Sequence, residues 1–183
     1  MLRCVLTVAI ALSAATAHAD ATLSPDKIAE LYFDAARAGR VDILDGLIAA
    51  GAPVEARNDK GYTALILSAY NDKPEAVEFL VSKGASPCAT DASGNTALMG
   101  TAFKGNDAMA RRLLGYDCDV NATNRSGQTA IMMAALFGRT EQVKLMLSKG
   151  AKVETSDFMG YTAWALARIQ GNDELAAILS GKN

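Results

Sequence analysis

Gly61-Tyr62-Thr63-Ala64-Leu65 is the stretch that decides the fold, because close copies of it return at a fixed interval. The copies begin at Gly94, Gly127 and Gly160, so that the same 33-residue step separates each from the one before. An Asn or Asp stands three residues before each glycine, and a second marker, Gly-Ala, keeps the same step at 51, 84 and 150. Two markers that share one period indicate a chain built from repeated units.

Each unit reads as a turn followed by two short helices. The Asn or Asp and the Gly three residues later are typical of a turn, since Gly adopts positive φ without strain. Helix N-caps are expected at the regularly spaced threonines, namely Thr63, Thr96, Thr129 and Thr162. A first helix such as 64–71 then ends in a turn at Gly105, Gly138 or Gly171, where the second unit has Asp72. A second helix carries apolar residues at helical spacing and ends at Gly84 or Gly150.

Small side chains recur where neighbouring first helices must touch. They keep the 33-residue step at Ala35, Ser68, Thr101, Ala134 and Ala167, and again at Ala36, Ala69, Ala102 and Ala135. Small residues allow helices to stack closely along a solenoid. The second series ends at Arg168, and a charged residue there suits a terminal unit that no further unit covers.

This pattern resembles the ankyrin repeat, which has a 33-residue period and a T-P-L-H-x-A core. The resemblance implies an all-α ankyrin-repeat solenoid of stacked helix-turn-helix units with β-turn fingers. It spans Ser24 to Ser180 and predicts about five units, at 24–57, 58–90, 91–123, 124–156 and 157–183, of which the first and last are caps. A tetratricopeptide solenoid is disfavoured, because its 34-residue period and its Trp, Leu-Gly and Tyr positions are absent.

The chain departs from the ankyrin core in three ways. Ala replaces Pro after each Thr, and residues such as Ile66 and Met99 replace His. Because the Thr-to-His bonding between units is lost, packing is expected to hold the units together. Asp117 replaces the glycine that ends the second helix, so this corner is expected to be the least regular.

The first 19 residues predict export. Arg3 precedes an apolar run, and Ala17-His18-Ala19 matches a signal-peptide cleavage pattern before Asp20. We therefore expect a cleaved signal peptide at 1–19, a repeat domain at 20–183 and a periplasmic location, or secretion if the producer has no outer membrane. No membrane association is expected after cleavage.

Composition excludes several functions. The whole chain has 18 Lys and Arg against 20 Asp and Glu, which argues against a nucleic-acid partner. His18 is the one histidine and lies in the predicted signal, so no histidine relay or histidine-ligated metal is expected. No phosphate-binding glycine motif is present. We expect no enzyme activity, catalytic residue, cofactor, metal or small-molecule substrate.

The resemblance implies that a protein partner binds to the fingers and to the exposed face of the first helices. The matching finger positions are Asp59, Lys60, Tyr62, Asn95, Arg125, Gln128, Phe158, Met159 and Tyr161. The matching positions near the ends of the first helices are Tyr70, Asn71, Phe103, Lys104, Leu136 and Phe137. Aromatic residues at solvated positions are typical of binding hot spots, although the same rings could simply pack on the next unit. The cations among them would favour an acidic partner.

Cys88 and Cys118 leave two alternatives open. They do not occupy equivalent positions of their units, and stacked helices lie about 8–10 Å apart, so a disulfide needs an irregular corner at Asp117. The other interpretation, which we favour from the spacing, is a pair of small buried apolar residues.

Two functions fit these expectations. The first is a scaffold that supports a resident periplasmic enzyme, and the similarity to exported bacterial ankyrin-repeat proteins suggests an antioxidant enzyme such as catalase. The alternative is an inhibitor or immunity protein that blocks a toxin or an enzyme.

Overall fold

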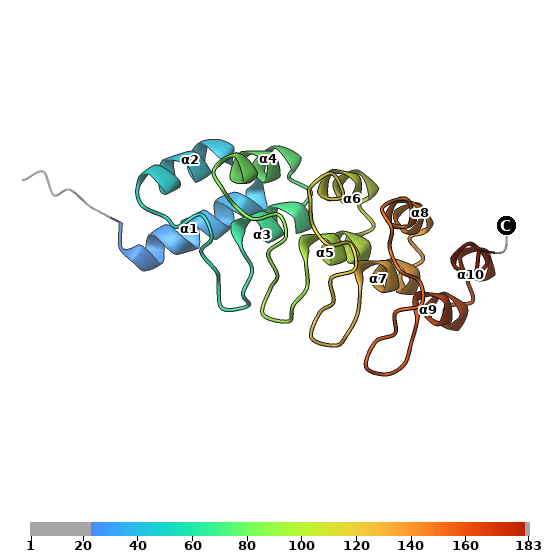
Figure 1. The fold of residues 1–183 in the computed structure, drawn as a ribbon. Coiled ribbons are helices and arrows are strands. Elements are labelled where there is room, and N and C mark those ends of the chain that lie inside the picture. Colours follow the sequence, from blue (N-terminus) through green and yellow to red (C-terminus); the bar gives the residue numbers. More distant parts are fainter. Residues whose placement is uncertain (1–22, 182–183) are drawn as a thin grey trace, which may run out of the picture.

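The computed structural model describes residues 23–181, and in them helices of successive units stack side by side in two rows (Figure 1). The inner row consists of α1 (Pro25–Ala38), α3 (Ala64–Tyr70), α5 (Ala97–Lys104), α7 (Ala130–Leu136) and α9 (Ala163–Ile169). The outer row consists of α2 (Val41–Ala49), α4 (Pro74–Ser82), α6 (Asp107–Leu113), α8 (Thr140–Ser148) and α10 (Asp173–Leu179). The expected all-α solenoid is confirmed, while the predicted signal peptide at 1–19 lies outside the described residues.

Helix ends follow the expected chemistry at most positions. The hydroxyls of Thr63, Thr96 and Thr162 each accept an N–H of the first helical turn. Thr129 is the N-cap of α7, as expected, and its backbone N–H donates to the Met132 sulfur, 3.5 Å away. Asp72 has a φ of 54°, the only positive φ of a non-glycine residue in the part of the chain that the structure describes.

Four finger loops project from the same side of the inner row (Figure 1). In each finger the leading Asn or Asp accepts two backbone N–H groups, from the residues two and four positions later. Asn58 binds Lys60 and Tyr62 in this way, and Asp91, Asn124 and Asp157 repeat the pattern. The turn that the sequence predicted is therefore fixed by its own side chain.

Hydrogen bonds join one finger to the next. The acceptors are backbone carbonyl oxygens of the preceding finger. The N–H of Ala92 donates to the carbonyl of Lys60, that of Arg125 to Ser93 and that of Phe158 to Ser126, over 2.9–3.0 Å. The Asn124 amide also donates to the Asn95 amide oxygen, 2.9 Å away. The expectation that packing alone holds the units together is therefore wrong, because finger backbones supply bonds that do not depend on the missing histidine.

The small residues at the 33-residue spacing form the seam between inner helices. Ala36, Ala69, Ala102 and Ala135 are all at most 1% exposed, and Ser68, Thr101, Ala134 and Ala167 are fully buried. Arg168, where the second series ends, is exposed and pairs with Asp173. Its exposure agrees with the expectation of a solvated residue in the last unit.

The corner at Asp117 is irregular, as expected. Helix α6 ends at Leu113, whereas α4 and α8 end at the position equivalent to residue 115. Asp117 does not adopt a positive φ, and the chain instead makes a tight turn in which the Cys118 N–H donates to the Tyr116 carbonyl.

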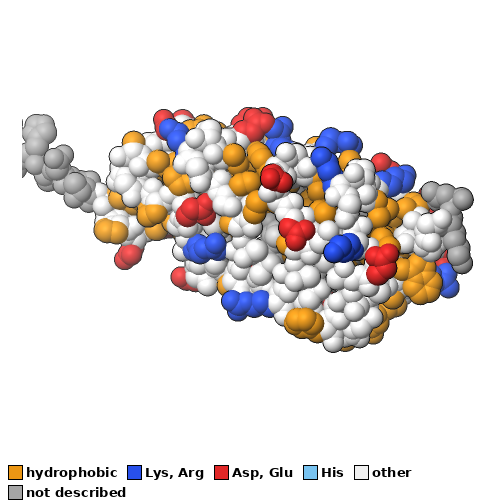
Figure 2. All heavy atoms as spheres, viewed as in Figure 1, with side chains coloured by type: hydrophobic (Ala, Val, Ile, Leu, Met, Phe, Trp, Pro, Cys, Tyr) orange, Lys and Arg blue, Asp and Glu red, His pale blue; other side chains and the backbone are white. Residues whose placement is uncertain are grey.

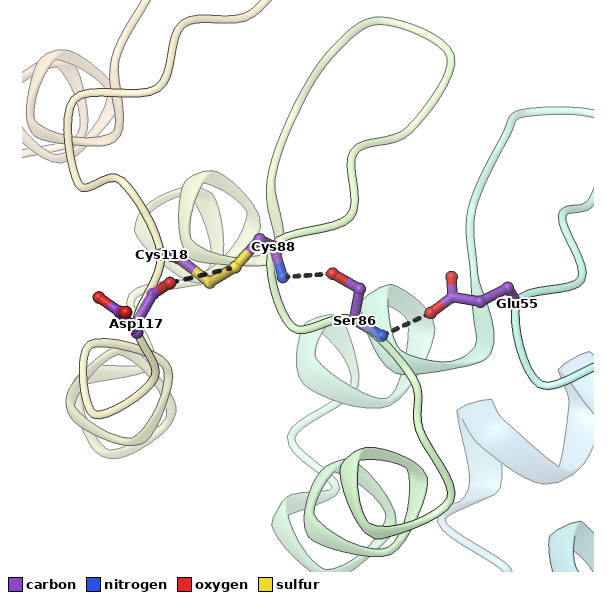
Figure 3. The surroundings of a disulfide bond; sticks show 5 residues. All are labelled: Glu55, Ser86, Cys88, Asp117 and Cys118. Carbon is purple, nitrogen blue, oxygen red and sulfur yellow. Dashed lines mark hydrogen bonds between the residues drawn. A yellow bond between two sulfur atoms is a disulfide. The ribbon is translucent and has the colours of Figure 1, made fainter.

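This corner brings the two cysteines together. A disulfide joins Cys88, which follows α4, to Cys118, which follows α6, with their Cα atoms 5.4 Å apart (Figure 3). Cys88 is exposed. The favoured interpretation of two buried apolar residues is therefore wrong, because the early end of α6 moves Cys118 within bonding distance of the neighbouring unit.

Candidate functional site

A row of large apolar side chains runs along the ends of the inner helices. Tyr70, Phe103, Leu136 and Ile169 recur at the 33-residue spacing, each at or next to the end of its helix. Tyr70, Phe103 and Ile169 are 37%, 50% and 60% exposed. We call these four residues, with the adjacent Phe137, the apolar row. Leu136 and Phe137 are half-buried. Clustered exposed apolar side chains are typical of a surface that another molecule covers.

The aromatic members of the row contact one another across units. The Tyr70 and Phe103 rings are stacked with centroids 6.2 Å apart, and Phe137 meets Phe103 edge-on at 5.2 Å. The Lys104 ammonium lies 4.8 Å from the Tyr70 ring centroid, a cation–π distance. The rings therefore pack on each other and also keep solvent-facing surface, so that the surface is ordered before any partner arrives.

Two pockets lie between the fingers and the inner helices, and we call this surface the groove. One pocket of about 590 Å³ is lined by the first finger and α3, including Lys60, Tyr62 and Tyr70. The other, of about 220 Å³, continues past Tyr62 and Tyr70 to Met99 and Phe103 on α5. The groove thus joins finger positions to the apolar row, as a partner-binding surface requires.

The predicted finger residues divide into two groups. Asp59, Lys60 and Arg125 are exposed at the tips of their fingers and Tyr62 is half-buried in the groove. Three predicted contact residues instead use their amides inside the protein, namely Asn71, Asn95 and Gln128. The structure assigns these amides to fixing helix α3 and the fingers.

The last finger is the most apolar. Phe158 and Met159 are 81% and 79% exposed, and Tyr161 is 36% exposed. The backbone of Phe158 is bonded to Ser126, and its ring lies against Gly127 of the preceding finger. The tip therefore contacts the preceding finger while its two large side chains remain exposed.

Ile169 belongs to the site, although the sequence analysis omitted it. Its 33-residue spacing from Leu136 was visible in the sequence.

The cations of the groove pair with no acidic residue in the described part of the chain. Ion pairs among the described residues join seven cations elsewhere to neighbouring carboxylates, but none involves Lys60, Lys104 or Arg125. Figure 2 shows acidic and basic side chains interspersed over the face that it presents. Other described cations, such as Lys73, Lys149 and Lys152, also form no ion pair, so unpaired positive charge is not confined to the groove.

Among residues 23–181, no group of three or more metal-ligating side chains is close enough to hold an ion. None of the described helices has both the length and the apolar character needed to cross a membrane.

Comparison with known proteins identifies the family. The model described as ankyrin repeats (3 copies) matches residues 32–124 and again residues 98–183, which is most of the chain. No curated protein matches the chain. Together with the stacked helix pairs and fingers, the match shows that the chain belongs to the ankyrin-repeat family.

Proposed function

We propose that this protein is a non-catalytic module that works in the periplasm, where its groove holds a resident enzyme, such as an antioxidant enzyme, and supports its activity. Ankyrin repeats generally mediate contacts between proteins. The apolar row carries the proposal, because the Tyr70 and Phe103 rings pack on their neighbours and still expose 37% and 50% of their surface. Such preorganised aromatic surface is typical of interface hot spots.

The location rests on the sequence alone. The segment 1–19 has the positive start, apolar run and small-residue cleavage pattern of a signal peptide. The disulfide is consistent with it, since disulfides persist in the oxidising periplasm and are rare in the cytosol. Fractionation of cells that express the whole chain, with N-terminal sequencing of the product, tests both export and cleavage before Asp20.

A capture experiment tests the binding role. The protein purified from cells expressing the whole chain serves as bait for periplasmic extract, and a Tyr70→Ala/Phe103→Ala/Phe137→Ala variant serves as the comparison. An Ile43→Ala variant, altered on the outer helix α2, controls for loss of exposed apolar surface elsewhere. Circular dichroism establishes that all variants are folded.

The expected result is an enzyme retained by the wild type and by Ile43→Ala but lost by the triple variant. Its activity, measured with and without the purified protein, then separates two roles. Unchanged or raised activity supports a scaffold, whereas strong inhibition supports the alternative of an inhibitor or immunity protein. Equal retention by the triple variant would show that the apolar row is not the binding surface.

A further inference from the structure

The smaller pocket of the groove depends on a glycine in the middle of a helix. Gly100 lies within α5, and the equivalent residues of the neighbouring units are Leu67 and Met133. Glycine inside a helix destabilises it by about 1 kcal/mol relative to alanine. A Cβ at Gly100 would lie 3.3 Å from Cδ2 of the Tyr70 ring, so the missing side chain leaves the space beside that ring.

The pocket beside Gly100 is mainly apolar. Its walls include Tyr70, Gly100, Phe103 and Met133, and Asp91 and Asn95 lie on the finger side. Its volume of about 220 Å³ is of the size that accepts one aromatic ring or branched side chain.

The polar side chains on the finger side of the pocket already form hydrogen bonds within the protein. The Asp91 carboxylate accepts N–H groups from Ser93 and Asn95 and from the Asn95 amide. The wall therefore offers little free hydrogen-bonding capacity, and an apolar group is the occupant that fits.

Three cations lie on the fingers and the inner-helix ends near the pocket, although none of them lines it. Lys104 lies over Tyr70 at its rim, Lys60 lies along the groove on the first finger, and Arg125 lies on the third finger. None of the three is in an ion pair with any residue of the described part of the chain. The exposed acids near these cations are Asp59, beside Lys60, and Asp72 and Asp107, which line a neighbouring pocket with Lys104, and none of them is in an ion pair with the three cations.

We infer that the groove binds an extended protein segment in which one large apolar side chain is flanked by Asp or Glu residues. The apolar side chain enters the pocket that Gly100 leaves open, and the flanking carboxylates meet Lys104 and Lys60. This inference rests on the proposed binding role of the groove and adds to it the chemistry of the partner and the residue that admits it.

Selection from random peptides displayed on phage tests the inference without a known partner. The bait is the protein purified from cells that express the whole chain. Gly100→Leu fills the pocket with the side chain that the preceding unit carries at Leu67, and it should raise helix propensity. Gly46→Leu is the matched control, because Gly46 lies in α2 and a Cβ there meets no atom within 4 Å.

The inference predicts enriched peptides with a Phe, Leu, Ile or Met flanked by acids. They should bind Gly46→Leu as they bind the wild type and bind Gly100→Leu about tenfold or more weakly, the effect of excluding one apolar side chain. Lys60→Glu/Lys104→Glu should weaken the same peptides and reduce the dependence of their affinity on salt. Thermal unfolding establishes that each variant is folded.

Two failures are distinguishable. Peptides that lack acids or bind Gly100→Leu normally, yet are lost by the Tyr70/Phe103/Phe137 alanine variant, would overturn the anchor pocket and leave the binding role of the groove standing. Peptides that bind this alanine variant normally would overturn both. Failure to enrich any peptide would count against an extended segment as the partner.

Discussion

Cys88 and Cys118 lie in neighbouring units, yet their Cα atoms are only 5.4 Å apart and a disulfide joins them. The bond crosses the boundary between the unit of α3 and α4 and the unit of α5 and α6. At this boundary the outer helices α4 and α6 pack less closely than α2 with α4 or α6 with α8. The disulfide therefore adds a covalent link at a boundary that the ion pair between Glu78 of α4 and Arg112 of α6 also spans.

We expect the Cys88→Ser/Cys118→Ser variant to be less stable by about 3 kcal/mol, because the bond closes a loop of 30 residues in the unfolded chain. Urea unfolding followed by circular dichroism measures the loss, and reduction of the wild type should reproduce it. The variant should not respond to the reductant. Equal stability of the oxidised and reduced wild type would contradict a stabilising bond.

Asp72 offers a stabilising substitution. It has a φ of 54°, and glycine occupies the equivalent position at Gly39, Gly105, Gly138 and Gly171. A side chain is strained in this conformation, so Asp72→Gly should raise the free energy of unfolding by about 0.5–1 kcal/mol. The matched control is Asp59→Gly, an exposed finger position without a positive φ, which should not stabilise the protein.

Arg139 connects the unit of α7 to the end of α5. Its guanidinium donates hydrogen bonds to the carbonyl oxygens of Ala102 and Phe103, at 3.1 and 3.2 Å. Arg139→Gln should cost about 1–2 kcal/mol of unfolding free energy, since bonds from a charged donor to helix-end carbonyls are lost. Arg111→Gln, on the exposed face of α6, is the control for loss of one charge, and an equal effect there would exclude a specific role for Arg139.

Tyr32 should make stability depend on alkaline pH. Its ring is fully buried, its hydroxyl donates to the Val54 carbonyl over 3.0 Å, and burial followed by the nearby Glu55 charge raises its pKa to about 12. Because the pKa is higher in the folded state than its ordinary value of 10.0, this contribution to stability is complete below pH 10 and falls as the pH rises toward 12.

Tyr32→Phe tests this dependence. The variant lacks the hydroxyl that donates to the Val54 carbonyl, so its free energy of unfolding at neutral pH should be lower by about 1 kcal/mol. Between pH 10 and 12 its stability should fall less than that of the wild type, because it has no phenol to titrate. Urea unfolding across this range measures both effects. Parallel stability curves for the two proteins would show that Tyr32 does not titrate with unfolding.

The groove was only partly predictable. The 33-residue spacing identified Tyr70, Phe103 and Leu136 as equivalent positions, and the same spacing could have added Ile169. It could not show that the Tyr70 and Phe103 rings stack, nor that Gly100 leaves a pocket beside them. These relations depend on side-chain conformations that are set by neighbouring units.

The sequence by itself determined the repeating unit, the turns and most of the caps. These features arise from contacts between residues a few positions apart, such as the Asn58 side chain with the N–H groups of Lys60 and Tyr62. The tertiary structure decided which inner-helix side chains remain exposed and whether the cysteines meet. Cys88 and Cys118 are 30 residues apart in a chain with a period of 33, and only the early end of α6 places them within reach of each other. A spacing that differs from the period carries no information about distance until the helices are packed.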